Sequence, residues 1–272
     1  LDLSSIKIIT STGSPLAEES FKYVYSNIKK DVHLASIAGG TDMVGCLVLG
    51  NLFSNVYKGE IQGQSLAIDV DVFTEEGKSA KDGEKGELVV KKPFPSMPIK
   101  FWGDKDGKKY HKAYFTKFKN IWHHGDFIER TSNNGFIVRG RSDATLNPGG
   151  VRIGTAEIYQ QVENINFITE GLVVGQDYKD DVRVVLFVTT KNNEDLDDEK
   201  IKIIKAKIRK NCSPKHVPAI IIKVPAIPRT KSGKIVELAV RKLINGEELN
   251  NKEAIANPES LDFFKNLTQL KI

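Results

Sequence analysis

The sequence predicts a mixed fold of the α/β and α+β classes, in two parts that differ in their residue pattern. Strand patterns dominate up to about residue 142, and helical and strand patterns alternate from 143 to 272. The 272 residues are 40% hydrophobic, which is enough to bury the core of one large domain or of two ordinary ones. We therefore expect a globular protein with a strand-rich first part and a compact α+β second part.

The first part opens with a strand and a helix. The run IKIIT at 6–10 is typical of a buried strand, and small turn-forming residues follow it. Between 17 and 30, apolar residues from Phe21 to Ile28 recur at the spacing of one helix face. We expect a buried strand, a loop and an amphipathic helix, in that order.

Strand signals then fill residues 45–142. SLAIDVDVF alternates apolar and polar residues, and GELVV follows an acidic turn. FIERTSNNGFIVRGR places two apolar runs on either side of Asn-Asn-Gly, which is typical of a hairpin. This section is expected to be rich in β structure.

The second part begins near 142–144, where the pattern changes. Thr155 precedes a helical pattern in the way an N-cap does. EGLVVG and RVVLFVTT follow as strands, and LDDEKIKIIKAKIRKN as a helix with acidic residues first and basic residues last, as the helix dipole favours. The strand AIIIKV, the turn PRTKSGK and the helix IVELAVRKLIN complete an α-β-β-α-β-α order.

Composition argues against several classes of protein. The 40 basic and 35 acidic residues are mixed along the chain, and no interleaving of basic and aromatic residues indicates a nucleic-acid surface. No apolar run approaches the ~20 residues of a membrane helix. Cys46 and Cys212 are far apart and lack metal-ligand spacing, so we expect reduced thiols in a cytosolic protein.

Four loops contain more glycine and polar residues than their neighbours require: STGSPL (11–16), AGGTDMVG (38–45), HHGDFIE (123–129) and GRSDATLNPGGVRIG (140–154). The turn PRTKSGK (228–234) is notable for a different reason, a lysine directly after a Ser-Gly pair and before a helix. Glycine lets a backbone approach a ligand closely, and Thr, Asp, Arg and Lys contact phosphate, metal and ribose. Each loop alone is more typical of an ordinary surface turn than of a ligand site.

Taken in order and spacing, these loops resemble the adenylate-forming acyl-CoA synthetase superfamily. GRSD with NPGGVRIGTAEIY, HGDF before it and PRTKSGK after it carry the resemblance, which extends across nearly the whole chain. It implies that 1–142 is the C-terminal part of the large AMP-binding domain and that 143–272 is the small mobile domain. The family's upstream phosphate loop has no counterpart in the sequence, so we expect the chain to lack the N-terminal part of the enzyme and to be inactive alone.

The resemblance implies a role in adenylation for four charged residues. Lys234 would be the catalytic lysine, which contacts the acid and the α-phosphate of ATP and offsets the repulsion between two anions. Asp126 would bind the ribose hydroxyls, Arg141 ribose and phosphate, and Arg152 phosphate. The structural alternatives are a solvated turn lysine, a turn-capping aspartate and surface ion pairs.

Two further loops would complete the nucleotide site. Gly13, Ser14 and Pro15 resemble the family's adenine-side loop, with serine in place of its glutamate. Thr41 and Asp42 resemble the family's Thr-Glu pair, in which the threonine contacts phosphate and the acid holds Mg²⁺. Aspartate is one methylene shorter than glutamate, so we expect Asp42 to reach the metal through water.

The resemblance also implies a second conformation, for the reaction with CoA. Asp143 falls at the family's hinge, where rotation of the small domain would withdraw Lys234 and bring Gly149 and Gly150 to line the pantetheine tunnel. Arg209 falls where a related synthetase carries an arginine for the CoA phosphate; its alternative is a solvated end of a basic helix.

The acid substrate is the least constrained part of the prediction. Ala38 and Gly39 stand where acetyl-specific relatives carry tryptophans, which leaves room for a longer acyl group. FWGDKDGKKYHKAYFTKFKNIWHHGDF and NPESLDFF resemble members of the family that act on acetoacetate. We expect ligation of acetoacetate to CoA with ATP and Mg²⁺. A ligase for another short- or medium-chain acid, a non-catalytic nucleotide- or CoA-binding remnant, and an α/β protein with chance motifs are the alternatives. His123 and His124 receive no role, because the acid arrives ionised.

Overall fold

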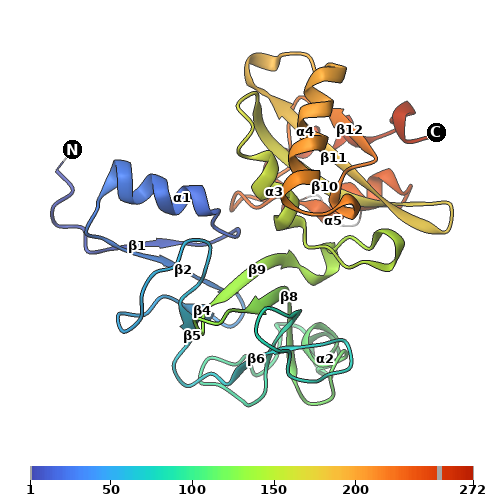
Figure 1. The fold of residues 1–272 in the computed structure, drawn as a ribbon. Helices are drawn as coiled ribbons and strands as arrows, with labels where there is room; N and C mark the ends of the chain where they lie inside the picture. Colours follow the sequence, from blue (N-terminus) through green and yellow to red (C-terminus); the bar gives the residue numbers. More distant parts are fainter. Residues whose placement is uncertain (1, 250–252, 272) are drawn as a thin grey trace. The chain divides into compact units, whose positions relative to one another are not determined.

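The computed structural model describes residues 2–249 and 253–271 (Figure 1). The chain divides into two compact units, residues 1–142 and 143–272. Each unit has its own sheets and hydrophobic core. Among the described residues, no helix combines the length and the apolar character that crossing a bilayer requires.

The first unit begins with a two-stranded parallel sheet and a helix between its strands. β1 (Ile8–Ser11) pairs with β2 (His33–Ser36), and α1 (Glu18–Tyr23) continues into a π-helical turn at Val24–Ile28. The predicted helix is confirmed. The predicted burial of the strand is wrong, since Ile8 is 51% exposed; a sheet of two strands offers few neighbours for its side chains.

The strand-rich section forms two antiparallel sheets. The first contains β3 (Ala38–Gly40), β4 (Gly45–Leu49) and β5 (Gly63–Gln64), and the second contains β6 (Val70–Phe73), β7 (Lys85–Val90), β8 (Trp122–Arg130) and β9 (Phe136–Arg141) in chain order. The hairpin predicted around Asn-Asn-Gly is confirmed as the β8–β9 pair, with Asn134 at a φ of 60° in its turn.

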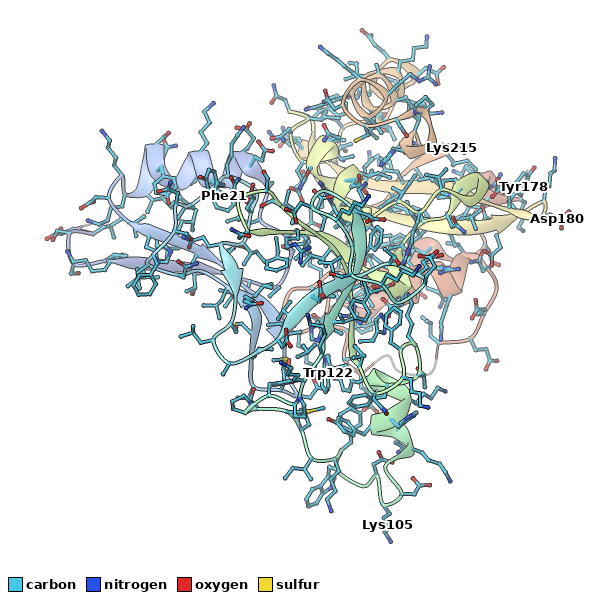
Figure 2. All side chains as sticks on the ribbon, turned by 60° about the horizontal axis from the view of Figure 1, so that its bottom comes forward. Phe21, Lys105, Trp122, Tyr178, Asp180 and Lys215 are labelled. Atoms are coloured by element: carbon cyan, nitrogen blue, oxygen red, sulfur yellow. The ribbon has the colours of Figure 1, made fainter. Side chains whose placement is uncertain are left out.

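A helix that the sequence analysis did not predict interrupts this section. α2 (Lys108–Tyr114) lies between β7 and β8. The buried Asp104 carboxylate accepts the backbone N–H groups of Lys109 and Tyr110, at 3.1 and 2.8 Å, and so satisfies two free donors of the first turn. The ring of Tyr114 stacks on Trp122 with a centroid distance of 3.6 Å, which joins the helix to the core of the unit. Trp122 is labelled in Figure 2.

The second unit is built on a three-stranded sheet. β10 (Ile168–Tyr178) and β11 (Asp181–Thr190) are antiparallel, and β12 (Ile220–Lys223) pairs with β11 in parallel. Its helices are α3 (Thr155–Val162), α4 (Asp198–Asn211) and α5 (Glu237–Ile244). Short 3₁₀ turns occupy Ser142–Ala144, Pro148–Gly150, Lys191–Asn193, Pro214–His216, Pro258–Phe264 and Thr268–Leu270. The predicted element order is confirmed.

The predicted N-cap of α3 is wrong by one residue. Gly154 is the N-cap and Thr155 is already helical and buried. The Gly154 N–H donates to the Glu157 carboxylate at 3.0 Å. The side chain of the third helical residue thus caps the backbone of the N-cap residue, as in a capping box.

Helices cover both faces of the β10–β11–β12 sheet. The side chains of Val184, Leu186 and Val188 pack with α3 and α4, which lie side by side (Figure 1). Val185 and Phe187 point to the opposite face and pack with α5 and the C-terminal 3₁₀ segments. Because both faces are buried, the strands are continuous apolar runs in the sequence.

Candidate functional site

In the first unit, the β8–β9 pair brings two predicted residues together. Asp126 lies directly opposite Arg141. The Arg141 guanidinium donates to the Asp126 carboxylate at 3.0 Å and to the backbone oxygen of His124 at 3.2 Å. The Asp126 side chain is 12% exposed and that of Arg141 is 49% exposed. An acceptor-only carboxylate therefore lies beside a forked cationic donor at the surface, which suits a diol next to a phosphate.

Gly125, in the HGD motif, makes this contact possible. Its φ is +83°, in the left-handed region, and a Cβ at this position would lie 2.6 Å from the Arg141 Nη2 atom. A side chain at position 125 would strain the backbone and displace the arginine.

His124 belongs to the same group, although the sequence analysis gave it no role. Its ring is buried, and Trp122 Nε1 donates to its Nδ1 atom at 3.3 Å, so the neutral ring carries its proton on Nε2. That Nε2 atom lies 3.7 Å from the Asp126 carboxylate. Burial lowers the pKa of His124, and the charge of Asp126 opposes this shift. The signal in the sequence is the spacing of two residues, which places His124 and Asp126 on one face of a strand.

The turn between β3 and β4 adjoins this group. Thr41 and Asp42 are exposed there, and a Cβ built at Gly40 would lie 3.1 Å from His124 Cε1 and 3.4 Å from Asp42 Oδ1. The Tyr114 hydroxyl donates to the Asp42 carboxylate. Burial and this carboxylate raise the pKa of Tyr114, so the phenol keeps its proton. Tyr114 is a member of the group that the sequence analysis did not identify.

Asp42 is the predicted metal ligand of this unit. In the part of the chain that the structure describes, no three His, Cys, Asp or Glu side chains are grouped to hold a metal ion. A single exposed carboxylate fits Mg²⁺ when phosphate and water oxygens supply its other ligands.

Gly39, predicted to shape the acid pocket beside Ala38, has a structural requirement of its own. A Cβ at position 39 would lie 2.1 Å from the Gly45 carbonyl oxygen and 2.5 Å from Cys46 Cα. The pairing of β3 with β4 shifts register at this point. A larger side chain at position 39 would therefore require β4 to move.

The predicted adenine-side loop lies in the same unit, at the end of β1. Gly13, with φ +97°, and its neighbours Ser14 and Pro15 form an exposed bend after β1. Within the described residues, no hydrogen bond joins this bend to Asp126 or Thr41.

In the second unit, Lys234 closes an exposed turn. The Thr230 carbonyl accepts the Gly233 N–H, and the Lys234 carbonyl accepts the Thr230 N–H, both at 2.8 Å. Arg229 donates to the Gly233 carbonyl at 2.6 Å and to the Glu170 carboxylate on β10 at 2.8 Å. No ion pair involves the Lys234 ammonium within the described residues. The turn is fixed by Arg229, while its lysine is exposed and available to an anion.

The loop before α3 contains two consecutive glycines in left-handed conformations. Gly149 has φ +57° and Gly150 has φ +75°. The Gly149 N–H donates to both carboxylate oxygens of Asp181, at 2.8 and 3.1 Å. Gly150 and Asn147 line an open cavity of about 690 Å³ together with the β10–β11 turn.

The other predicted residues of this unit lie on separate segments. Arg152 follows the glycine loop, and its Nε donates to Thr145 Oγ1 at 3.3 Å. Arg209 is exposed on the last turn of α4, and Asp143 is exposed at the start of the unit. The structure thus groups Asp126, Arg141 and the Thr41–Asp42 turn, and distributes the remaining predicted residues over other loops.

Comparison with known proteins assigns this fold. Over 99% of its length the chain is 59% identical to acetoacetyl-coenzyme A synthetase of Rhizobium meliloti (strain 1021) and 45% identical to acetoacetyl-CoA synthetase of Xenopus tropicalis. The solved acetoacetyl-CoA synthetase from Streptomyces lividans matches all of this chain with a TM-score of 0.90 and 39% identity. The chain matches the C-terminal part of the adenylate-forming enzymes. The family resemblance and the predicted fold class are both confirmed.

The chain covers less than half of the length of these relatives. It spans 41% and 40% of the two curated relatives and 42% of the Streptomyces chain. A benzoate CoA ligase from Burkholderia xenovorans LB400, at 24% identity and a TM-score of 0.73 over 87% of this chain, shares the adenylate-forming fold. No protein-family model matches the sequence.

Proposed function

We propose that the chain is the C-terminal portion of an acid–thiol ligase that joins acetoacetate to CoA. The carboxylate of acetoacetate attacks the α-phosphate of ATP, which gives acetoacetyl-adenylate and pyrophosphate. The CoA thiol then attacks the carbonyl carbon of the adenylate, which gives acetoacetyl-CoA and AMP. The observation that carries the proposal is 59% identity to an acetoacetyl-coenzyme A synthetase over 99% of the chain.

The nucleotide would bind in the first unit, which we interpret as part of the large AMP-binding domain. Asp126 would accept hydrogen bonds from both ribose hydroxyls, while Arg141 exchanges part of its contact with Asp126 for a phosphate oxygen. Thr41 would contact phosphate, and Gly13 with its neighbours Ser14 and Pro15 would flank the adenine. The buried ring of His124, whose Nε2 atom lies 3.7 Å from that carboxylate, would enclose it on one side.

Mg²⁺ would be held at Asp42, through water and the phosphate oxygens of ATP. The ion neutralises the charge of those phosphates when it is bound. Tyr114 would fix the carboxylate by donating to one of its oxygens.

The second unit, interpreted as the small mobile domain, would supply the residues that change between the two steps. Lys234, exposed on its turn, would place its ammonium between the acid and the α-phosphate. Arg152 would bind the phosphate in that state. After rotation about Asp143, Gly149 and Gly150 would line the channel of the thiol, and Arg209 on α4 would bind the phosphate of the CoA nucleotide. We also place the reaction in the cytosol, in keeping with two free thiols at Cys46 and Cys212.

The acid pocket would include Ala38 and Gly39. Small residues on β3 leave room for the four-carbon chain of acetoacetate. A panel of short- and medium-chain acids tests this choice with the full-length protein that contains the chain. Acetoacetate is expected to give the highest kcat/KM, and a higher value for another acid would reassign the substrate.

The variant Lys234→Ala in the full-length protein tests the mechanism. We expect the rate of adenylation, measured by pyrophosphate exchange, to fall by about 100-fold or more. The reason is that the cation that offsets charge repulsion is lost. Conversion of supplied acetoacetyl-adenylate to thioester should persist. Lys231→Ala, an exposed lysine of the same turn, is the control and should retain both steps. Unchanged adenylation in Lys234→Ala would show that this lysine is a solvated turn residue.

A further inference from the structure

The proposed function makes the Gly149–Gly150 loop part of the thiol channel, and the structure identifies what holds that loop. On the basis of that proposed function, we propose that Asp181 is a positioning residue for thioester formation. It acts by fixing the conformation of the Gly149–Gly150 loop.

Asp181 reaches the loop from a turn distant in sequence. It is the first residue of β11, after a tight turn in which Lys179 and Asp180 both have positive φ, at 47° and 60°. Both oxygens of its carboxylate accept the Gly149 N–H. One of them also accepts the N–H of the next residue, Val182, at 2.7 Å. These hydrogen bonds lower the pKa of Asp181, so the carboxylate is ionised near neutral pH. Hydrogen bonds to an ionised acceptor are about twice as strong as neutral ones.

Lys215 lies beside the loop and comes from a third segment. It lies in the 3₁₀ turn Pro214–His216, after α4. A Cβ built at Gly149 would lie 2.3 Å from Lys215 Nζ and 3.9 Å from an Asp181 oxygen. Lys215 and the turn residues Tyr178 and Asp180 can be followed in Figure 2. Gly149 therefore lies between an ammonium and a carboxylate, and a side chain at this position would strain its left-handed backbone and displace the end of Lys215.

The physical need for this support follows from the glycines. Two consecutive residues without side chains have many accessible conformations, and fixing them carries a large entropic cost. Asp181 and Val182 also line the cavity beside Gly150, so its shape depends on the same contact. Without Asp181 the loop would sample other conformations, and the channel for the thiol would be preformed in only a fraction of molecules. The residues of this unit proposed for adenylation are held by other contacts: Lys234 lies on a different turn, and Arg152 donates to Thr145 Oγ1. Adenylation therefore does not depend on the contact of Asp181 with Gly149.

The test compares Asp181→Ala with Asp180→Asn in the full-length protein. Asp180 is the matched control, because it is the adjacent acid and asparagine tolerates its positive φ. For Asp181→Ala we expect thioester formation from supplied acetoacetyl-adenylate to fall by about 10- to 100-fold in kcat/KM for CoA, with adenylation unchanged. Asp180→Asn should retain both steps. Faster hydrogen exchange at the Gly149 amide in Asp181→Ala would report the released loop.

Each outcome decides a specific claim. If the unmodified protein is active and Asp181→Ala forms thioester at the parent rate, the inference about Asp181 is wrong and the proposed function stands. If both steps fall together, Asp181 has a general structural role and the positioning role is wrong. If the unmodified protein makes no acetoacetyl-CoA, the proposed function fails, and the role of Asp181 in the thioester step fails with it.

Discussion

Asp126 and Arg141 contact each other across two strands because the residue before Asp126 has no side chain. The Arg141 guanidinium occupies the space where a Cβ at Gly125 would lie. His124, on the other side of Gly125, is buried with a lowered pKa and faces three charged groups: Asp126 and Asp42, which favour its protonated form, and Arg141, which opposes it. The three residues of the HGD motif thus have three different roles. His124 is a neutral donor, Gly125 leaves space for the Arg141 side chain, and Asp126 supplies a carboxylate.

At the residue scale, Gly125→Ala is expected to strain the backbone and also to weaken ATP binding. The left-handed φ should lower the free energy of unfolding by roughly 1–2 kcal/mol, and the clash with Arg141 should weaken ATP binding. Gly83→Ala is the matched control, because its φ is +79° and nothing lies within 4 Å of its Cβ. Urea unfolding and ATP titration of the full-length variants measure the two effects. Equal loss of ATP affinity in both variants would remove the link to Arg141.

At the scale of elements, the sequence predicted the strands of the second unit well because both faces of its sheet are buried. Long apolar runs such as RVVLFVTT have few alternative structures. α2 was not predictable from periodicity, because its seven residues depend on the buried Asp104 for their first hydrogen bonds. The burial of β1 was misjudged for a related reason: burial depends on neighbouring strands, and an isolated apolar run contains no information about them.

The candidate site shows the same limit in the β8–β9 hairpin. Asn-Asn-Gly predicted the turn, and Arg130 pairs with Phe136 beside it. Continued without interruption, that register would place Gly140 opposite Asp126. A bulge shifts the pairing between Phe127 and Ile128, so that Arg141 takes this place. The motifs identified both residues, but their contact depends on one extra residue in a strand, which the pattern of side chains does not reveal.

At the scale of elements, the prediction concerns the stability that a buried carboxylate on β7 contributes. Glu87 is fully buried and accepts from Lys117, from His123 Nε2 at 2.9 Å and from the Ser142 hydroxyl. It joins β7, β8 and the last residue of the first unit, and it explains His123 as a structural partner. Glu87→Gln should lower the free energy of unfolding by about 3 kcal/mol, because the buried carboxylate loses its charge beside Lys117. Urea unfolding measures this change.

Two variants calibrate the Glu87 prediction. Ser142→Ala removes one hydroxyl donor and should cost about 1 kcal/mol. Glu84→Gln, an exposed acid on the neighbouring turn, should leave stability within about 0.5 kcal/mol of the parent. A Glu87→Gln variant as stable as Glu84→Gln would contradict the role given to the buried carboxylate.

For the whole molecule, the division of the hydrophobic clusters between the two units predicts that each unit unfolds cooperatively by itself. One cluster lies within residues 1–142, and the other two lie within 143–272 on the two faces of one sheet. The residues proposed to bind the nucleotide belong to the first unit, and Lys234 with the Gly149–Gly150 loop belongs to the second. A protein that rotates one domain against another between two reactions requires each domain to keep its own fold throughout.

The variant Phe187→Ala tests this independence. Phe187 is fully buried on β11, and its ring lies 4.8 Å from that of Phe264, so the cavity should cost about 3–5 kcal/mol. We expect amide hydrogen exchange in the full-length protein to accelerate along β10 and β11, while β7 and β8 keep their protection. Leu88→Ala, fully buried on β7, is the reciprocal control and should accelerate exchange in the first unit only. If either substitution accelerated exchange equally in both units, they would unfold as one cooperative body, and the proposed rotation about Asp143 would lose its physical basis.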